Sequence, residues 1–180
     1  MQSTRDIKKR IRSVKNISQI TKAMEVVSAT KMRRSQGFAI RARPYATASL
    51  EMMKNLLART ASLPPLFKER RVKQSAVLVI TSDKGLAGAF NANVLRKAEL
   101  ALSELETSYS LITVGKKSRD FFSNRHIPIA QSFWGFGDYT ELRDTLPVAE
   151  FLIQGFLRGT WDEVYAIYTN FRTTLRQETV

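Results

Sequence analysis

The chain has 180 residues, no cysteine, and 29 lysine and arginine residues against 16 acidic ones, which gives a formal net charge of +13. This length allows one ordinary domain plus a long helical segment, and the absence of cysteine excludes a disulfide framework or a thiolate metal site. No apolar run approaches the ~18 residues of a membrane span, so no transmembrane helix is predicted.

Residues 1–57 are predicted to form one long helix. The first 36 residues contain neither glycine nor proline, and apolar side chains recur at helical spacing along one face. That face is a coiled-coil seam formed by Ile17, Ile20, Met24 and Val27. A helix of this length would extend roughly 80 Å, farther than the chain's own domain could cover. The seam therefore needs another helix to pack against. Without one, self-association of two chains or collapse of the helix onto the domain would cover the seam instead.

The positive charge is concentrated in this helix. Residues 1–57 hold 13 basic and three acidic residues, a net charge of +10, whereas the rest of the chain is nearly neutral. Such a segment would attract an acidic protein surface, a nucleic acid or an anionic lipid. A basic face that is merely solvated is the simpler alternative.

Residues 58–74 are predicted to be a linker. Leu63-Pro64-Pro65-Leu66-Phe67 stops the helix, because paired prolines cannot continue it.

Residues 75–180 are predicted to form an α/β domain. Residues 76–81 are a continuous apolar and β-branched run, typical of a strand buried on both faces. The remaining elements are a helix at 93–105, a strand at 111–114, a short helix at 117–123, a weak strand at 127–129, a helix at 141–157 and a strand at 164–171. This alternation predicts a Rossmann-like parallel sheet with helices on both faces. Because the last strand runs almost to Val180, we expect the domain to be truncated at its C-terminal end.

The loop Ser82–Asn91 follows the first strand, where doubly wound folds often bind phosphates. Its glycine spacing matches no phosphate-binding motif, and Lys84 precedes both glycines. A tight βα turn is the favoured interpretation, ahead of a protein-contact loop and of nucleotide binding.

Other chemistry is sparse. The aromatic loop Phe133–Tyr139 could stack on a partner, but packing against the sheet edge is the preferred prediction. No nucleophile with a base and no carboxylate cluster is evident, so we expect no catalytic residue, no cofactor and no metal.

Two blocks of the helix resemble the N-terminal helix of the F-type ATP synthase gamma subunit. They are Ile7-Lys8-Lys9-Arg10-Ile11-Arg12-Ser13-Val14-Lys15-Asn16 and Ile20-Thr21-Lys22-Ala23-Met24-Glu25-Val26-Val27-Ser28-Ala29-Thr30-Lys31-Met32-Arg33-Arg34. Arg43-Pro44-Tyr45 and Ser82-Asp83-Lys84-Gly85-Leu86-Ala87-Gly88 are also similar to that family. The resemblance covers essentially the whole chain.

The resemblance implies a non-catalytic rotor subunit. In the family, the N-terminal helix pairs with a C-terminal helix inside the ring of alpha and beta subunits. The α/β domain lies near the epsilon subunit and the ring of c subunits. Ion-driven rotation then changes the catalytic sites of the beta subunits in turn. The implied location is peripheral, on the cytoplasmic face of a bacterial inner membrane, because the cysteine-bearing insert of chloroplast members is absent.

The resemblance also implies which residues contact the acidic loop of the beta subunit. Carried over by position, these are Lys22, Met24, Lys31, Arg33, Arg34, Asp83, Lys84 and Ala87. The C-terminal helix of the family is missing here, so we expect a fragment or a truncated gene product. A basic nucleic-acid-binding protein remains the alternative, although residues 5–34 lack interleaved aromatic side chains. An enzyme of doubly wound fold is the weakest alternative.

Overall fold

The computed structural model describes residues 3–60, 63–138 and 140–180. The chain divides into two compact units, Met1–Ala61 and Ser62–Val180, and each is described by itself. Residues 1–2 of the predicted helix, residues 61–62 of the predicted linker and Tyr139 of the aromatic loop lie outside the described residues.

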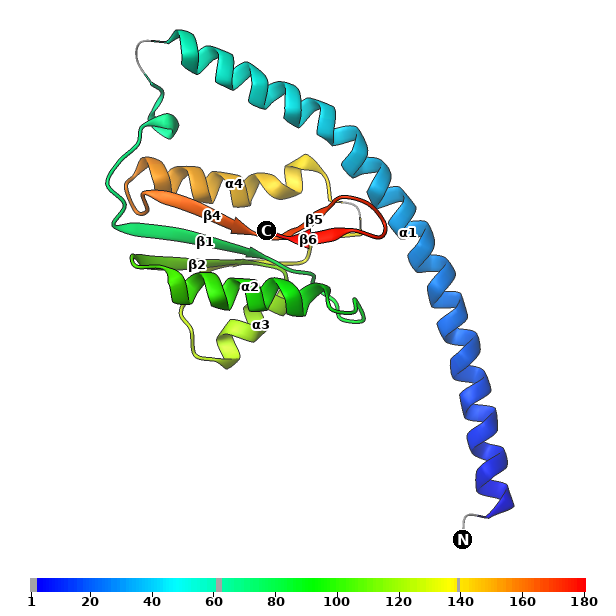
Figure 1. Ribbon diagram of the computed structural model, residues 1–180. Coiled ribbons are helices and arrows are strands. Elements are labelled where there is room, and N and C mark those ends of the chain that lie inside the picture. The colour runs from blue at the N-terminus through cyan, green and yellow to red at the C-terminus, as the bar shows by residue number, and fades with distance from the viewer. Residues whose placement is uncertain (1–2, 61–62, 139) are drawn as a thin grey trace. The chain divides into compact units, whose positions relative to one another are not determined.

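The first unit is a single helix, α1 (Thr4–Arg59), of 56 residues (Figure 1). Ser3 caps its N-terminus, because the Ser3 side chain accepts a hydrogen bond from the backbone N–H of Arg5 at 3.3 Å. Asp6 in the first turn and Arg59 in the last turn both complement the helix dipole. The helix continues through Pro44, where the missing N–H removes one backbone hydrogen bond. The prediction of a long N-terminal helix is confirmed.

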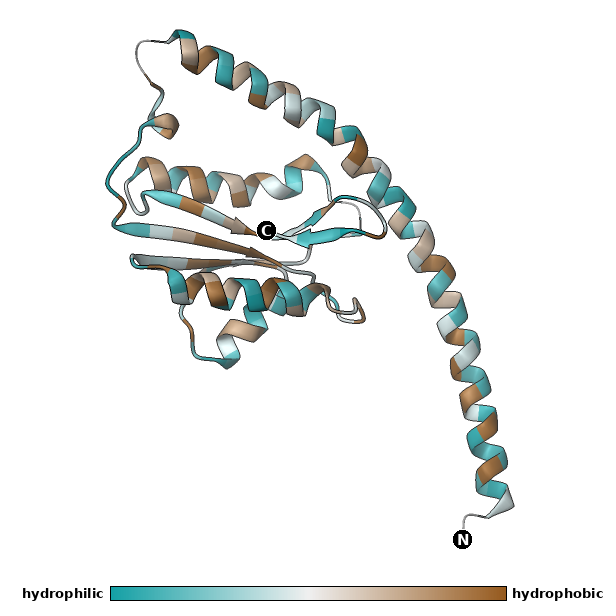
Figure 2. Ribbon diagram, viewed as in Figure 1, coloured by the Kyte–Doolittle hydropathy of each residue, from teal (hydrophilic) through white to brown (hydrophobic). Residues whose placement is uncertain are grey.

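None of the 56 residues of α1, all of which are described, is buried. Apolar and polar residues alternate along its whole length (Figure 2). Most helices in proteins are stabilised by burying an apolar face against another element. The exposed apolar face of α1 therefore lacks, within its own unit, the packing that would stabilise a helix of about 84 Å.

The second unit begins with a short 3-10 helix, η1 (Pro65–Phe67), and then forms a parallel sheet of four strands in the order β3-β2-β1-β4. The strands are β1 (Gln74–Ile80), β2 (Ser108–Val114), β3 (Ile129–Phe133) and β4 (Glu163–Ile167). The connecting helices are α2 (Phe90–Glu104), α3 (Lys116–Asn124) and α4 (Leu142–Leu157).

The helices cover both faces of the sheet, with α2 and α3 on one face and α4 on the other (Figure 1). Val77 and Val79 of β1 belong to the core cluster under α2 and α3. Ala76 and Leu78 of the same strand belong to the cluster under α4. Because β1 is buried on both faces, its residues 76–80 are a continuous apolar run. The predicted Rossmann-like parallel sheet is thus confirmed.

Two predicted strands were placed wrongly. The weak strand expected at 127–129 is β3 at Ile129–Phe133, an edge strand. Its Gln131 is exposed and its Ser132 is hydrogen-bonded to Thr113 of β2, so an apolar run could not reveal it.

The single strand expected at 164–171 is divided between two sheets. After β4, Tyr168 exchanges both backbone hydrogen bonds with Val180, at 3.0 and 2.9 Å. This pairing draws β5 (Thr169–Phe171) into an antiparallel hairpin with β6 (Gln177–Thr179). The apolar residues of β4 continue without a glycine or proline into Tyr168, and Phe171 follows in β5, so the sequence pattern alone does not show the break.

Candidate functional site

The seam residues of α1 form an exposed apolar stripe. Their exposed fractions range from 48% at Met24 to 59% at Ile20, with Ile17 and Val27 between them. The stripe also extends further towards the N-terminus than predicted, through Ile7, Ile11 and Val14, which are likewise exposed. Their spacing of four and three residues was the available signal. The surface is suited to binding another apolar helix face.

The predicted cations of α1 lie on two faces of the helix. At 3.6 residues per turn, Lys31 and Arg34 continue the face of the seam residues Met24 and Val27. Lys22 lies on the opposite face, as does Arg33. The structure therefore does not gather the four predicted cations into one patch, and only Lys31 and Arg34 adjoin the seam.

The loop between β1 and α2 is held by its own polar groups. Asn91 accepts a hydrogen bond from the backbone N–H of Ser82 at 3.0 Å, and its amide donates to the Ser82 hydroxyl at 2.9 Å. Leu86, at φ 57°, is 96% exposed, and Lys84 and Ala87 are exposed on either side of it. A left-handed leucine that is fully open to solvent is unusual, and this geometry suits a protein contact.

Asp83 has a different environment from its neighbours in this loop. Its carboxylate accepts one hydrogen bond from the backbone N–H of Lys116 at 2.9 Å and another from the backbone N–H of Gly135 at 2.8 Å. It thereby joins the loops that follow β1, β2 and β3. Asp83 holds the loop in place through these two hydrogen bonds, whereas the side chains of Lys84 and Ala87 are exposed to solvent.

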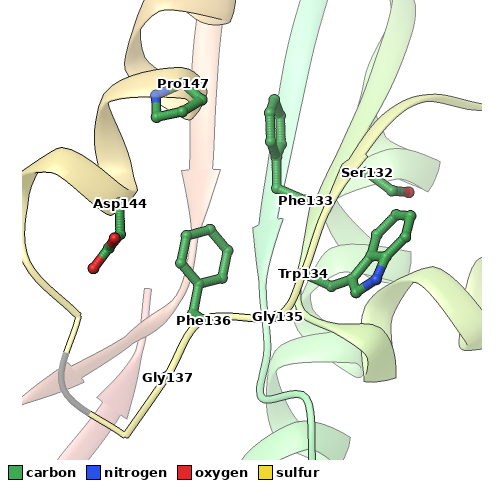
Figure 3. Close-up of a pocket in the computed structure, with 8 residues that line it drawn as sticks. All are labelled: Ser132, Phe133, Trp134, Gly135, Phe136, Gly137, Asp144 and Pro147. Atoms are coloured by element: carbon green, nitrogen blue, oxygen red, sulfur yellow. The ribbon is translucent and has the colours of Figure 1, made fainter.

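The aromatic loop after β3 borders a hollow of about 580 Å³. Phe133, Phe136, Pro147 and Trp134 are among the residues that line it, and the Trp134 ring lies on the other side of the loop from the Phe133 ring (Figure 3). Phe133 packs edge-on against Phe151 of α4, with ring centroids 5.9 Å apart. Trp134 is half exposed, and the guanidinium of Arg119 lies 4.7 Å from the centroid of its ring. Phe133 thus packs on the core cluster between the sheet and α4, whereas the Trp134 ring lies against Arg119 of α3.

Among the described residues, no three His, Cys, Asp or Glu side chains gather as a metal site would require. No helix in the described ranges is long and apolar enough to span a membrane.

Comparison with known proteins identifies close relatives. A family model described as ATP synthase matches residues 3–180. The ATP synthase gamma chain of Pelotomaculum thermopropionicum is 42% identical over 185 residues, which cover 100% of this chain and 64% of that protein. The ATP synthase gamma chain of Roseiflexus sp. is 44% identical over 183 residues, which cover 98% of this chain and 63% of that protein.

Solved structures of ATP synthase stalk and rotor chains also superpose on this chain. A chain from the central stalk and c-ring of Tetrahymena thermophila mitochondrial ATP synthase superposes with a TM-score of 0.67 at 26% identity, over 89% of this chain and 70% of that chain. A rotor chain of Euglena gracilis mitochondrial ATP synthase, with a TM-score of 0.66 and 17% identity, shares the fold. The chain spans about 64% of the length of the curated relatives it matches. It belongs to the ATP synthase gamma-chain family.

Proposed function

We propose that the chain supplies the shaft helix and the α/β domain of the central rotor stalk of an F-type ATP synthase. In this role it couples ion-driven rotation to ATP synthesis and hydrolysis in the beta subunits. The observation that carries the proposal is α1, a helix of 56 residues without one buried side chain, in a chain whose relatives are gamma chains. Such a helix serves as a shaft only when other subunits surround it.

The proposed role is mechanical and non-catalytic, so it requires no nucleophile, base, cofactor or metal from this chain. It requires a stiff helix, a compact domain to hold it, and contacts that can form and break at each step. Exposed ion pairs meet the last requirement, because each contributes only ~0–1 kcal/mol and is screened by salt.

The partners follow from the exposed surfaces. The apolar seam of Ile17, Ile20, Met24 and Val27 would pack against a second helix of the shaft. Lys31 and Arg34, which continue that face, would meet the acidic loop of a beta subunit when it approaches the seam.

Lys22 and Arg33 would meet another beta subunit from the opposite face of the helix. Lys84 and Ala87 would add contacts from the domain, with Asp83 fixing the loop that carries them. The α/β domain would face the epsilon subunit and the c-ring. The chain would then be a peripheral component, on the cytoplasmic face of a bacterial inner membrane.

Assembly with purified alpha and beta subunits tests this function. We expect a tagged chain to capture both subunits together and to raise the ATPase activity of the mixture. A chain in which Lys31 and Arg34 are both changed to Glu should capture less of the alpha–beta complex. The matched control changes Lys8 and Lys9 to Glu, which alters net charge equally but lies well before these positions.

A chain that captures neither subunit at low salt would contradict the proposal. Capture that added DNA displaces would instead indicate a nucleic-acid-binding protein, an alternative that finds no support among these relatives.

A further inference from the structure

The linker enters the α/β domain beside an arginine that binds two different elements. The guanidinium of Arg70 lies 4.0 Å from the centroid of the Phe156 ring at the end of α4. Its Nη1 also lies 3.9 Å from Oδ1 of Asp162, directly before β4. The Arg70 side chain is 30% exposed and that of Asp162 15% exposed, so solvent weakens this pair less than it would on an open surface.

Asp162 fastens the linker to the sheet through backbone groups. Its Oδ2 accepts hydrogen bonds from the N–H of Lys73 at 2.9 Å and of Gln74 at 3.2 Å. The backbone N–H of Asp162 donates in return to the carbonyl of Gln74 at 2.8 Å. These three bonds join the last linker residue and the first residue of β1 to the start of β4. Bonds to an ionised carboxylate are the stronger kind.

The turn that carries Asp162 is itself fixed to α4. The indole of the adjacent Trp161 donates a hydrogen bond to the carbonyl of Leu152 at 3.0 Å. A Cβ placed on Gly155 would lie 1.9 Å from the Trp161 ring, so the indole lies directly against the helix backbone. The helix η1, earlier in the linker, also contacts α4. The linker is therefore attached to α4 as well as to β1 and to β4, the edge strand beside it.

We propose that Arg70, Phe156 and Asp162 form a linker anchor that transmits torque between the shaft helix and the whole α/β domain. Without it, the part of the linker that follows η1 would pass force to the sheet through β1 alone, and the end of that strand would separate from its neighbours one hydrogen bond at a time. With it, the same force is shared among β1, β4 and α4. The attachment is a property of this domain, and only its mechanical role rests on the proposed rotor function.

Amide hydrogen exchange at Lys73 and Gln74 tests the attachment in the full chain. We expect Phe156→Leu and Arg70→Ala each to speed exchange at these amides about five-fold or more, because the local structure opens more often. Neither variant removes an acceptor of the amides that are measured. Phe156→Tyr keeps the aromatic face and should retain the protection of the parent chain.

The chain offers a matched control for the arginine. Arg125 lies 3.6 Å from the centroid of the Phe121 ring, and its Nε lies 3.1 Å from Oε1 of Glu99. This is the same chemistry outside the linker, so Arg125→Ala should leave exchange at Lys73 and Gln74 unchanged.

The mechanical role is tested in membrane vesicles that carry the assembled synthase. We expect Phe156→Leu to lower the ratio of ATP-driven proton pumping to ATP hydrolysis, and Phe156→Tyr to preserve it. A variant that merely destabilised the domain would lower both activities together and leave their ratio unchanged.

Three outcomes would overturn part or all of the inference. Equal exchange in Phe156→Leu and the parent would refute the anchor, whether or not the chain assembles. Faster exchange with an unchanged pumping ratio would refute its mechanical role. Failure of the parent chain to join alpha and beta subunits would refute the rotor function and the mechanical role with it, while the exchange data would still decide the anchor.

Discussion

The carboxylate of Asp83 accepts a hydrogen bond from the backbone N–H of Gly135 at 2.8 Å, across 52 residues of sequence. Its other oxygen accepts from the N–H of Lys116 at the start of α3. One half-buried side chain thus joins three loops at the carboxyl ends of the parallel strands. The exposed Lys84 and Leu86 beside it therefore lie on a loop that these hydrogen bonds hold in place.

Replacing Asp83 by Ala should destabilise the domain. Two backbone N–H groups would lose a charged acceptor, which corresponds to about 1–2 kcal/mol for a partly solvated group. Urea unfolding of the full chain measures this loss. Asp120→Ala is the control, since Asp120 is an exposed carboxylate that pairs with its neighbour Arg119 and should change stability by less than ~0.5 kcal/mol. Equal midpoints for the two variants would contradict the assigned role of Asp83.

Gly155→Ala should destabilise the domain through overpacking. The added methyl group would overlap the ring of Trp161, which is 3% exposed and packed within a core cluster. Overpacking of this kind costs about 1–3 kcal/mol. Thermal unfolding followed by tryptophan fluorescence measures it, with Gly85→Ala as control, because a Cβ there would meet only the end of the Lys117 side chain at 3.8 Å. A Gly155→Ala chain as stable as the control would show that the contact is not close.

In the absence of other subunits, the seam of α1 should drive self-association. Sedimentation equilibrium should show dimers, and changing Ile20 and Met24 to Gln should weaken association about 10-fold or more, because apolar burial is lost. Val26→Gln is the control, since Val26 is exposed on another face. Added salt should strengthen association by screening the repulsion between the two basic helices. A chain that stays monomeric at all concentrations would contradict this prediction.

Lys84→Ala should leave the isolated chain unchanged and alter only its assembly. Lys84 is exposed, so the free energy of unfolding should change by less than ~0.5 kcal/mol. We also expect no binding of ATP or ADP to either form, because Asp83 would repel a phosphate at this turn. Calorimetry that shows micromolar nucleotide affinity, abolished by Lys84→Ala, would instead support a nucleotide site.

The stability that Asp162 contributes should be lost only in acid. The backbone N–H groups of Lys73 and Gln74, aided by the nearby Arg70, hold the pKa of Asp162 below its ordinary value of 3.8. A carboxyl group whose pKa is lowered by folding stabilises the fold above its unfolded pKa, and the effect disappears as the pH falls through the folded pKa. The difference in thermal midpoint between the parent and Asp162→Asn should therefore be constant from neutral pH down to the ordinary pKa and shrink below it. A difference that shrinks already near neutral pH would contradict this assignment.

The sequence predicted those parts of the fold that have a strong local pattern. The long helix follows from uninterrupted apolar spacing, and β1 from a run that is apolar because both of its faces are buried. The edge strand β3 and the β5–β6 hairpin could not be predicted in the same way. Their bounds depend on backbone hydrogen bonds between residues of different segments, such as Tyr168 with Val180. Such bonds produce no periodic pattern of apolar residues in the sequence.

The candidate functional residues divide in the same way, into those that a local sequence pattern predicts and those that only the folded structure shows. The exposed apolar stripe that contains Ile17, Ile20, Met24 and Val27 could be predicted because each position depends only on helical spacing, and its role as a coiled-coil seam stays a prediction. Spacing cannot show that Asp83 binds the backbone of Gly135, or that Arg70 lies between Phe156 and Asp162. Both arrangements arise when the folded sheet brings its loops together, and both determine how the exposed surfaces are held.

Rotation of single complexes tests the central claim most directly. The chain has no cysteine, so Leu175→Cys, at a hairpin position that is 99% exposed, provides one thiol to which a bead can be attached. The alpha–beta complex is fixed to a surface through its beta subunits, and the bead is observed when ATP is added. The proposed function predicts sustained rotation in one direction that stops when ATP is removed. A bead that shows only undirected thermal motion with ATP present would contradict it.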